Sequence, residues 1–190
     1  MEKGYVQVYT GDGKGKTTAA MGLIVRALGA GLKVLFIQFM KGSEYSEIKF
    51  LRNVGSAGQS AAQSAAQSAG QSAAQLEIRQ YGTGHFITGK ADNEQIEAGA
   101  KGLREAAAAL QSGQYDLVVL DEANMAVYFG LFSVDDLIKA IKNRAPGVEV
   151  IITGRRADPK LIDAADLVTE MREVKHYYTQ GVMARQGIEM

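Results

Sequence analysis

The sequence predicts an α/β fold in which a mostly parallel β-sheet carries helices on both faces. Short apolar segments alternate along the chain with longer, helix-compatible segments, which is the pattern of consecutive βαβ units. Two of the apolar segments, 33–39 and 116–120, are almost continuously apolar, as expected for strands covered on both sides. Ligands of such sheets bind beyond the carboxyl ends of the strands, so functional side chains are expected just after residues 10, 39, 81, 120 and 153.

The predicted elements follow one another in chain order. A short strand over residues 5–10 leads through a glycine-rich turn to a helix over residues 16–29. Next come a strand over 33–39, a helix over 44–53, a strand over 76–81, an Ala-rich helix over 92–111 and a strand over 116–120. Ser133 and Asp136 have the spacing of a capping box, which predicts a helix from there to about residue 143, before Pro146. Strands over 148–153 and 166–171 complete the sheet.

Residues 56–75 differ from the rest of the chain, because they consist of five four-residue units, SAGQ SAAQ SAAQ SAGQ SAAQ. The tract has no charge, no aromatic residue and no large aliphatic residue, so burial cannot offset the entropy lost on ordering it. A period of four residues is also too short for a solenoid repeat. We therefore interpret residues 56–75 as a flexible insertion in a single domain that spans residues 1–190.

The composition argues against several classes of protein. The 190 residues include 21 Lys+Arg and 21 Asp+Glu, whereas proteins that bind nucleic-acid phosphates usually carry a basic excess. The absence of Cys excludes disulfides, thiolate zinc sites and a Cys nucleophile, and two His residues cannot build a His-rich metal site. No apolar run approaches the length of a membrane span, and the first residues do not resemble a signal peptide. We expect a cytoplasmic protein with neither nucleic-acid nor membrane partners.

The turn after the first strand reads Thr-Gly-Asp-Gly-Lys-Gly-Lys-Thr-Thr over residues 10–18 and resembles a phosphate-binding P-loop. The standard pattern, G-x-x-x-x-G-K-[ST], has a glycine where this chain has Thr10, so the loop is one residue short from Gly11. Its glycines can still turn backbone N–H groups towards an anion, and the following helix adds its positive end. The alternative is a turn that only joins strand to helix. The predicted nucleotide-binding residues are Gly11, Asp12, Gly13, Lys14, Gly15, Lys16, Thr17 and Thr18.

A pair of carboxylates, Asp121 and Glu122, follows the buried strand over 116–120. With Lys16 holding phosphate oxygens, the Thr17 hydroxyl and both carboxylates are placed to hold Mg²⁺, Asp121 through water. A solvated acidic strand end is the alternative. The loop and the acid pair together predict a P-loop NTPase (RecA-like) fold that binds Mg-nucleotide. The reaction stays open at this point, and Glu122 would be the general base of an ATPase.

Four stretches of the sequence resemble one family in particular, the P-loop type of ATP:corrinoid adenosyltransferase, which acts on cob(I)alamin or cob(I)yrinic acid a,c-diamide. They are residues 10–22, residues 31–42 with Glu44-Tyr45, residues 115–124, and Thr153-Gly-Arg155 followed by residues 165–176 and the Gly187-Ile-Glu189 ending. The likeness covers nearly everything outside the repeat. A generic P-loop ATPase would share only the first and third stretches.

The resemblance implies a specific chemistry. Cobalt(I) of the corrinoid attacks C5′ of ATP in line and the whole triphosphate leaves, so no residue need remove a proton. Lys16, the loop amides and Mg²⁺ would stabilise the leaving group, and Glu122 would orient Mg²⁺ or water rather than act as a hydrolytic base. ATP lies reversed in this family relative to other P-loop enzymes. The resemblance also implies a reductase that supplies cobalt(I), and a homodimer.

Further candidates lie at the predicted ligand edge. Lys41 could reach phosphate or ribose, or be an ordinary surface lysine, and Arg155 could contact phosphate or form a surface ion pair. Phe86 could pack on the corrin ring or in the core, and His85 could approach cobalt but is more simply an ordinary loop residue. Residues 175–178 could line the corrinoid pocket or dock the chain end against the domain or a second subunit.

The chain departs from the family pattern in the repeat, in lacking a helix before the first strand, and in lacking a Trp after residues 82–86. A P-loop ATPase or a small-molecule kinase is the chief alternative, and corrinoid-dependent turnover would distinguish it. A RecA-like nucleic-acid motor and a nucleotide-sensing module without turnover are two others.

Overall fold

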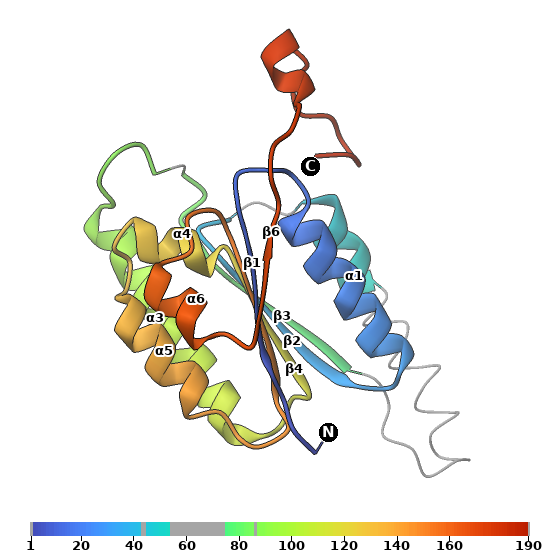
Figure 1. The fold of residues 1–190 in the computed structure, drawn as a ribbon, viewed down its shortest axis with the longest axis vertical. Helices are drawn as coiled ribbons and strands as arrows, with labels where there is room; N and C mark the ends of the chain where they lie inside the picture. Colours follow the sequence, from blue (N-terminus) through green and yellow to red (C-terminus); the bar gives the residue numbers. More distant parts are fainter. Residues whose placement is uncertain (1, 43–44, 54–74, 86, 190) are drawn as a thin grey trace.

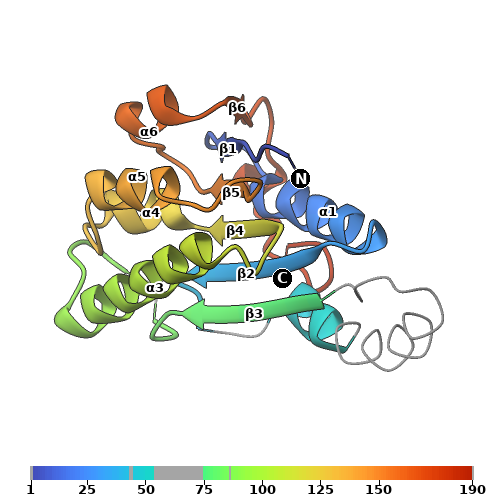
Figure 2. The same ribbon diagram turned by 90° about the horizontal axis from the view of Figure 1, so that it is seen from below.

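The computed structural model describes residues 2–42, 45–53, 75–85 and 87–189. At its centre is a six-stranded sheet with the order β3-β2-β4-β5-β1-β6, and every pair of neighbouring strands is parallel (Figures 1 and 2). The strands are β1 Val6–Thr10, β2 Lys33–Phe39, β3 Gln75–Tyr81, β4 Leu117–Asp121, β5 Glu149–Thr153 and β6 Leu167–Glu170. The predicted parallel α/β sheet is confirmed. One strand, β5, separates the loop strand β1 from the acidic strand β4.

Helices cover both faces of this sheet, as Figure 2 shows. On one face lie α1 (Lys16–Gly29) and a helical segment at 46–53. On the other lie α3 (Asn93–Ser112), α4 (Ala123–Tyr128), α5 (Val134–Lys142) and α6 (Pro159–Ala164). A short 3-10 helix, η1 (Tyr177–Gln180), follows β6 and projects beyond the sheet (Figure 1).

The central strand β2 shows why its sequence is almost continuously apolar. Leu35, Ile37 and Phe39 pack in the core cluster that contains side chains of α3 and α5. Val34 and Phe36, which alternate with them, pack in the second cluster, against α1. Because both faces are covered, these five side chains all lie in an apolar environment.

The sequence did not predict the three shortest helical elements, α4, α6 and η1. Each is too short to show an apolar repeat, and α4 begins from Glu122 in the left-handed region, with φ of 61° and no capping side chain. The capping box predicted at Ser133 is confirmed in part, since the Ser133 hydroxyl accepts a hydrogen bond from the Asp136 N–H group. The reciprocal box lies instead at the start of α3, between Asp92 and Gln95.

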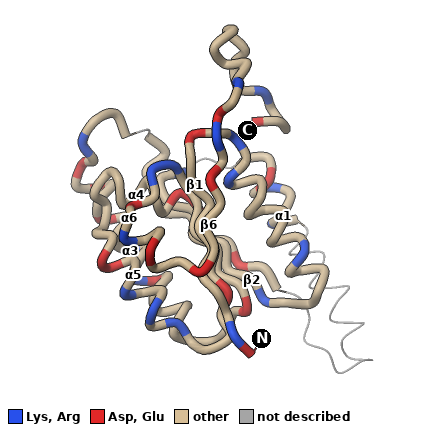
Figure 3. The backbone as a smooth tube through the Cα atoms, viewed as in Figure 1, with Lys and Arg blue, Asp and Glu red and all other residues tan. Residues whose placement is uncertain are grey.

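The repeat at 56–75 lies outside the described residues except for its last member. Gln75 is the first residue of β3 and pairs with Lys33 of β2, so the repeat as predicted extends one residue into the sheet. Within the described ranges, no helix is both long enough and apolar enough to cross a membrane. Basic and acidic residues both occur along the described backbone, and neither sign dominates the view in Figure 3.

Candidate active site

The glycine-rich loop joins β1 to α1 at the carboxyl edge of the sheet. Its last glycine, Gly15, stands at the N-cap of α1 with φ of 118°, and Gly11 has φ of 94°. Both conformations suit glycine because it has no Cβ atom. The loop borders a hollow of about 940 Å³. Since the N-terminus of α1 opens into this hollow, the site favours an anion.

The chain segment after β6 packs against the same loop. Gly13 N–H donates to Met171 O at 2.7 Å, and Met171 N–H donates to Thr10 O at 2.8 Å. A Cβ atom added at Gly11 or Gly13 would lie 2.5 or 2.7 Å from Met171 O. Both glycines are therefore required by this close packing. The Gly13 N–H group, predicted to face an anion, is bound to the backbone in this structure.

Lys16, the first residue of α1, folds its ammonium back onto the loop. Its Nζ atom donates to Gly11 O and Gly13 O, both at 2.6 Å, and the residue is 9% exposed. Burial lowers the pKa of Lys16, and the nearby Arg155 guanidinium lowers it further. An anionic group in the hollow would counter both effects, which is consistent with the predicted phosphate contact.

Asp121 ends β4 and is fully buried beneath the hollow. One carboxylate oxygen accepts from the Thr17 hydroxyl at 2.8 Å and from the Thr153 hydroxyl at 2.6 Å. The other accepts from Gln38 Nε2 at 2.9 Å and from Lys41 Nζ at 3.2 Å. Although burial opposes its ionisation, Lys41 and these hydrogen bonds hold the pKa of Asp121 below the ordinary value. Four donors occupy its acceptor capacity, so Asp121 can act on a ligand only through its neighbours.

Lys41 bridges the two carboxylates, with its ammonium 3.2 Å from Asp121 and 3.7 Å from Glu122. Burial alone would disfavour the charge of Lys41, but the two carboxylates raise its pKa. Its ammonium also lies 5.5 Å from the centre of the Tyr45 ring. This position at the first hollow, between two carboxylates, favours a site residue over an ordinary surface lysine. Glu122 itself has a raised pKa, because of burial and then of the Asp121 charge.

Among the described residues, three other than glycine have positive φ, and each follows one of three neighbouring strands. They are Met40 after β2, Glu122 after β4 and Arg156 after β5, with φ of 63°, 61° and 54°. Strained backbone of this kind clusters at functional sites, where surrounding contacts hold it. Here the Glu122 N–H donates to Thr153 Oγ1 at 3.1 Å, which ties the acid pair to β5.

A second hollow of about 780 Å³ is lined by Asp12, Ile87, Gly89, Lys90, Met125, Tyr128, Phe129, Arg155 and Arg156. Arg155 and Met125 also line the first hollow, so the two hollows meet at these side chains. In this second hollow the Arg156 guanidinium donates a hydrogen bond to the Tyr128 hydroxyl at 2.6 Å and lies 4.5 Å from the centre of the Tyr128 ring. The arrangement can hold two ligands side by side, with an anionic group at the loop.

The structure brings most of the predicted residues together. Around the first hollow lie Gly13, Lys14, Gly15, Lys16, Thr17, Thr18, Lys41, Glu122 and Arg155, and also His176. Asp12 lines the second hollow instead, and Asp121 lies below the surface of the first. His85 is exposed and lines neither hollow. Phe86 lies outside the described residues.

Sequence reasoning missed several residues of the site. Gln38 and Thr153, which bind Asp121, are polar residues in strands that are otherwise apolar, and this exception was the signal that could have found them. Met125 belongs to the unpredicted helix α4. Residues 187–189 line the first hollow, although the sequence supplied only their family likeness and no role for them.

The oxygen donors at the first hollow fit Mg²⁺. The Thr17 hydroxyl donates a hydrogen bond to Asp121, which leaves the lone pairs of the Thr17 oxygen available for a cation in the hollow. Glu122 supplies a carboxylate at the wall of the same hollow. Among the described residues, no group of three or more His, Cys, Asp or Glu side chains forms a metal cluster. Any Mg²⁺ here would need further oxygens from a bound nucleotide and water, which is the usual mode of Mg²⁺ binding.

Known proteins resemble this chain over nearly its full length. A family model described as ATP:corrinoid adenosyltransferase BtuR/CobO/CobP matches residues 2–190. A corrinoid adenosyltransferase of Pseudomonas aeruginosa is 34% identical, over 99% of this chain and 84% of that protein. Those of Escherichia coli K12 and Salmonella typhimurium are 32% and 33% identical, each over 99% of this chain and 86% of the relative. With its P-loop, its acid pair and this match, the chain belongs to the ATP:corrinoid adenosyltransferase family.

Proposed function

We propose that the two adjoining hollows hold the two substrates of one reaction, the transfer of the 5′-deoxyadenosyl group of ATP to the cobalt(I) of a corrinoid. The observation that carries this proposal is their shared wall, because Arg155 and Met125 line both. Triphosphate bound at the loop would place the adenosyl carbon C5′ near this wall. A corrinoid in the second hollow would then meet C5′ from the other side.

In this reaction the cobalt–C5′ bond forms while the bond from C5′ to the triphosphate oxygen breaks. The electron pair of the broken bond leaves with triphosphate, so the protein must stabilise growing negative charge. Lys14 and Lys16 supply positive charge at the loop end of the hollow, Arg155 supplies it at the shared wall, and the N-terminus of α1 adds its dipole. No side chain is required as a base.

Mg²⁺ would assist at the same place, where it would neutralise charge on the triphosphate. Thr17 would hold it directly, and Asp121 would orient the Thr17 hydroxyl. Glu122 would hold or orient water on the ion. Its contact with the Lys41 ammonium, at 3.7 Å, supports this role over that of a hydrolytic base, because Lys41 already engages its carboxylate.

Anaerobic incubation with ATP and chemically reduced cobalamin tests the proposal. Carbon–cobalt bond formation changes the corrin spectrum, and the phosphate product is expected to be intact triphosphate. Appearance of ADP and orthophosphate at the rate of ATP loss would contradict it and would favour the alternative, a P-loop ATPase or small-molecule kinase with Glu122 as base.

We also propose a homodimer. Leu167 and Val168 of β6, and Val174, Tyr178 and Met183 beyond it, are large apolar side chains that are at least 40% exposed. Light scattering is expected to give twice the mass of one chain.

A cytoplasmic location, and a separate reductase that supplies cobalt(I), complete the proposal. A chain without Cys is compatible with a reducing compartment, and cobalt(I) must be supplied by the one-electron reduction of cobalt(II). Cell fractionation tests the location. A requirement for an added reductant in the adenosylation assay tests the need for a reductase.

A further inference from the structure

The residues that follow β6 return to the phosphate-binding loop. We call residues 171–189 the strap. It leaves the sheet beside the loop through the Met171 contacts, turns through η1, and folds back so that Gly187, Ile188 and Glu189 line the first hollow. Figure 1 shows this path, with the C-terminal end of the strap close to the loop between β1 and α1.

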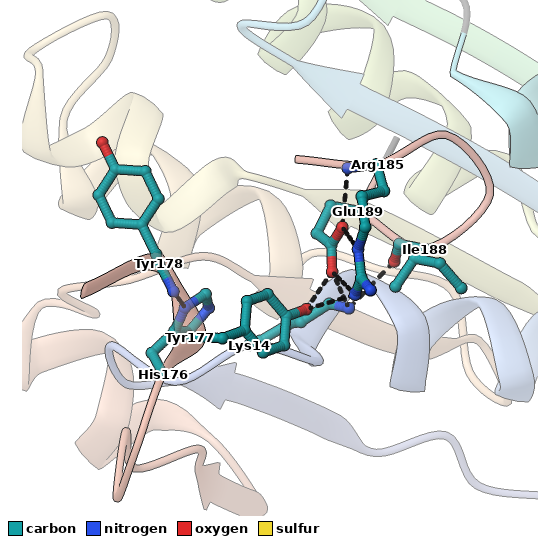
Figure 4. A network of polar contacts seen from close by, with 7 residues as sticks. All are labelled: Lys14, His176, Tyr177, Tyr178, Arg185, Ile188 and Glu189. Atoms are coloured by element: carbon teal, nitrogen blue, oxygen red, sulfur yellow. Dashed lines mark hydrogen bonds and ion pairs between the residues drawn. The ribbon is translucent and has the colours of Figure 1, made fainter. Parts of the chain in front are cut away.

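The far end of the strap meets the loop at Lys14, through the Glu189 carboxylate and the Ile188 carbonyl (Figure 4). One oxygen of the Glu189 carboxylate accepts from Lys14 Nζ at 3.2 Å, from Arg185 Nη2 at 3.1 Å and from the Tyr177 hydroxyl. The other accepts from Arg185 N–H at 2.8 Å and from Arg185 Nε at 3.3 Å. The Glu189 side chain is only 14% exposed, whereas that of Lys14 is 41% exposed. Glu189 is thus the fixed partner, and Lys14 is the side chain that it restrains.

The contact aims the Lys14 ammonium without using up its donors. Lys14 Nζ donates to Glu189 and to Ile188 O, at 3.0 Å, which leaves a third N–H group for the hollow that Lys14 lines. Arg185 balances the charge of Glu189, so the group of Lys14, Arg185 and Glu189 keeps one net positive charge. An exposed lysine held by nothing would lose more side-chain entropy on meeting a phosphate.

We propose that Glu189 is a positioning residue for ATP, which acts by holding Lys14 at the rim of the hollow and thereby closes the strap over the triphosphate. The inference rests on the proposed function, since it needs ATP in the first hollow. It predicts an effect on ATP binding rather than on the transfer step, because Lys14 and Glu189 are at the loop end and not at the shared wall.

The experiment compares Glu189→Gln, Lys14→Met and the double variant with the unchanged chain, by calorimetric ATP binding without corrinoid and by adenosylation kinetics. Each single variant is expected to weaken ATP binding and raise the KM for ATP about fivefold, the effect of a partly exposed ion pair. The double variant should lose no more than Lys14→Met alone, because the two residues act as one unit. The kcat and the corrinoid KM should stay unchanged.

Glu173→Gln is the matched control, because it makes the same substitution in the exposed part of the strap, away from both hollows. Hydrogen exchange adds a direct measure of closure: ATP should slow the amides of residues 182–189 in the unchanged chain and in the control, and less in Glu189→Gln.

Three results would overturn the inference. Equal ATP affinity in Glu189→Gln and the unchanged chain would exclude a positioning role. A fall in kcat and in thermal stability together, with both KM values altered, would show that Glu189 only holds the fold. Failure of the unchanged chain to bind ATP would overturn the proposed function, and with it the strap, and calorimetry of that chain alone distinguishes this case.

Discussion

The Asp121 carboxylate shows how a single side chain organises this site. Its four hydrogen-bond donors come from four places in the chain: Thr17 in α1, Gln38 in β2, Lys41 after β2, and Thr153 at the end of β5. A fully buried carboxylate needs such partners, because an unpaired charge in the interior is costly. Asp121, itself at the end of β4, therefore links Thr17 to the ends of β2 and β5, and Glu122 beside it lines the first hollow.

Replacing Lys16 with Met is expected to weaken ATP binding at least about 100-fold, because charge-assisted contacts to several phosphate oxygens are lost. The fold should persist, since within the described part of the chain the Lys16 ammonium bonds to two loop carbonyls and to no other group. Calorimetry measures the affinity and a thermal melt checks the fold. Lys139→Met, at an exposed position of α5, is the control. Unchanged ATP affinity in Lys16→Met would refute the assignment of the loop.

Glu122→Gln is expected to raise the free energy of unfolding at pH 7. The ordinary pKa of the group is 4.5, and burial with the nearby Asp121 charge raises it in the folded protein. The unfolded chain therefore ionises first, so the free energy of unfolding falls as the pH rises from 4.5 to the folded pKa, and it stays lower above that pKa. The gain from Gln should be complete above that pKa and should vanish as the pH falls towards 4.5.

Urea denaturation at a series of pH values measures this difference. Glu173→Gln, in the exposed part of the strap, should change the free energy of unfolding by no more than about 0.5 kcal/mol at any pH. A Glu122→Gln variant less stable than the unchanged chain at pH 7 would mean that the contact with Lys41 outweighs the cost of burying the charge.

At the level of the secondary-structure elements, Gly13 in the loop and Gly22 in α1 differ in whether they leave room for a side chain. Gly13→Ala would place its Cβ atom 2.7 Å from Met171 O and would break the backbone contact between the loop and the strap. Gly22, inside α1, has nothing within 4 Å of an added Cβ atom. Gly13→Ala should therefore lower the melting temperature and the ATP affinity, while Gly22→Ala should stabilise the protein by about 0.5–1 kcal/mol.

Thermal melts and ATP calorimetry on the two variants test this pair. Because the same Gly→Ala substitution is made at both positions, any difference between the two variants reflects the local packing and not the residue type that was introduced. Equal effects of the two substitutions would mean that the contact between Met171 and the loop does not form in solution.

The short helix α4 depends on contacts that its own sequence does not provide. Asn124 Nδ2 donates to Gly154 O at 2.9 Å, which joins the start of α4 to the end of β5, where Arg155 lies. Six residues cannot form a stable helix alone, since nucleation outweighs the few hydrogen bonds gained. Periodicity could predict α1 and α3 for the opposite reason, because they are long enough to present an apolar face.

For the chain as a whole, the repeat is expected to be dispensable. Deleting residues 56–71 removes four of the five units and keeps the last one, whose Gln75 pairs in β3. Shortening a connection in this way changes the closure entropy by only about 1 kcal/mol, in favour of the folded state. Adenosylation activity within about twofold of the full chain and an equal or higher melting temperature are expected. A large loss of activity would show that the repeat contributes to the site.

The sequence alone was sufficient to predict those site residues that lie in short contiguous motifs. Lys16, Thr17, Asp121 and Glu122 could be assigned because the loop and the acid pair are contiguous motifs, each directly after an apolar strand. The strand order, the shared wall of the two hollows and the strap required the folded chain, because they bring distant segments together. Thr17 is 104 residues from Asp121, and Lys14 is 175 residues from Glu189. Local propensity acts over a few residues, whereas such contacts depend on how whole elements pack, and this is why the site was predicted in its parts but not in its assembly.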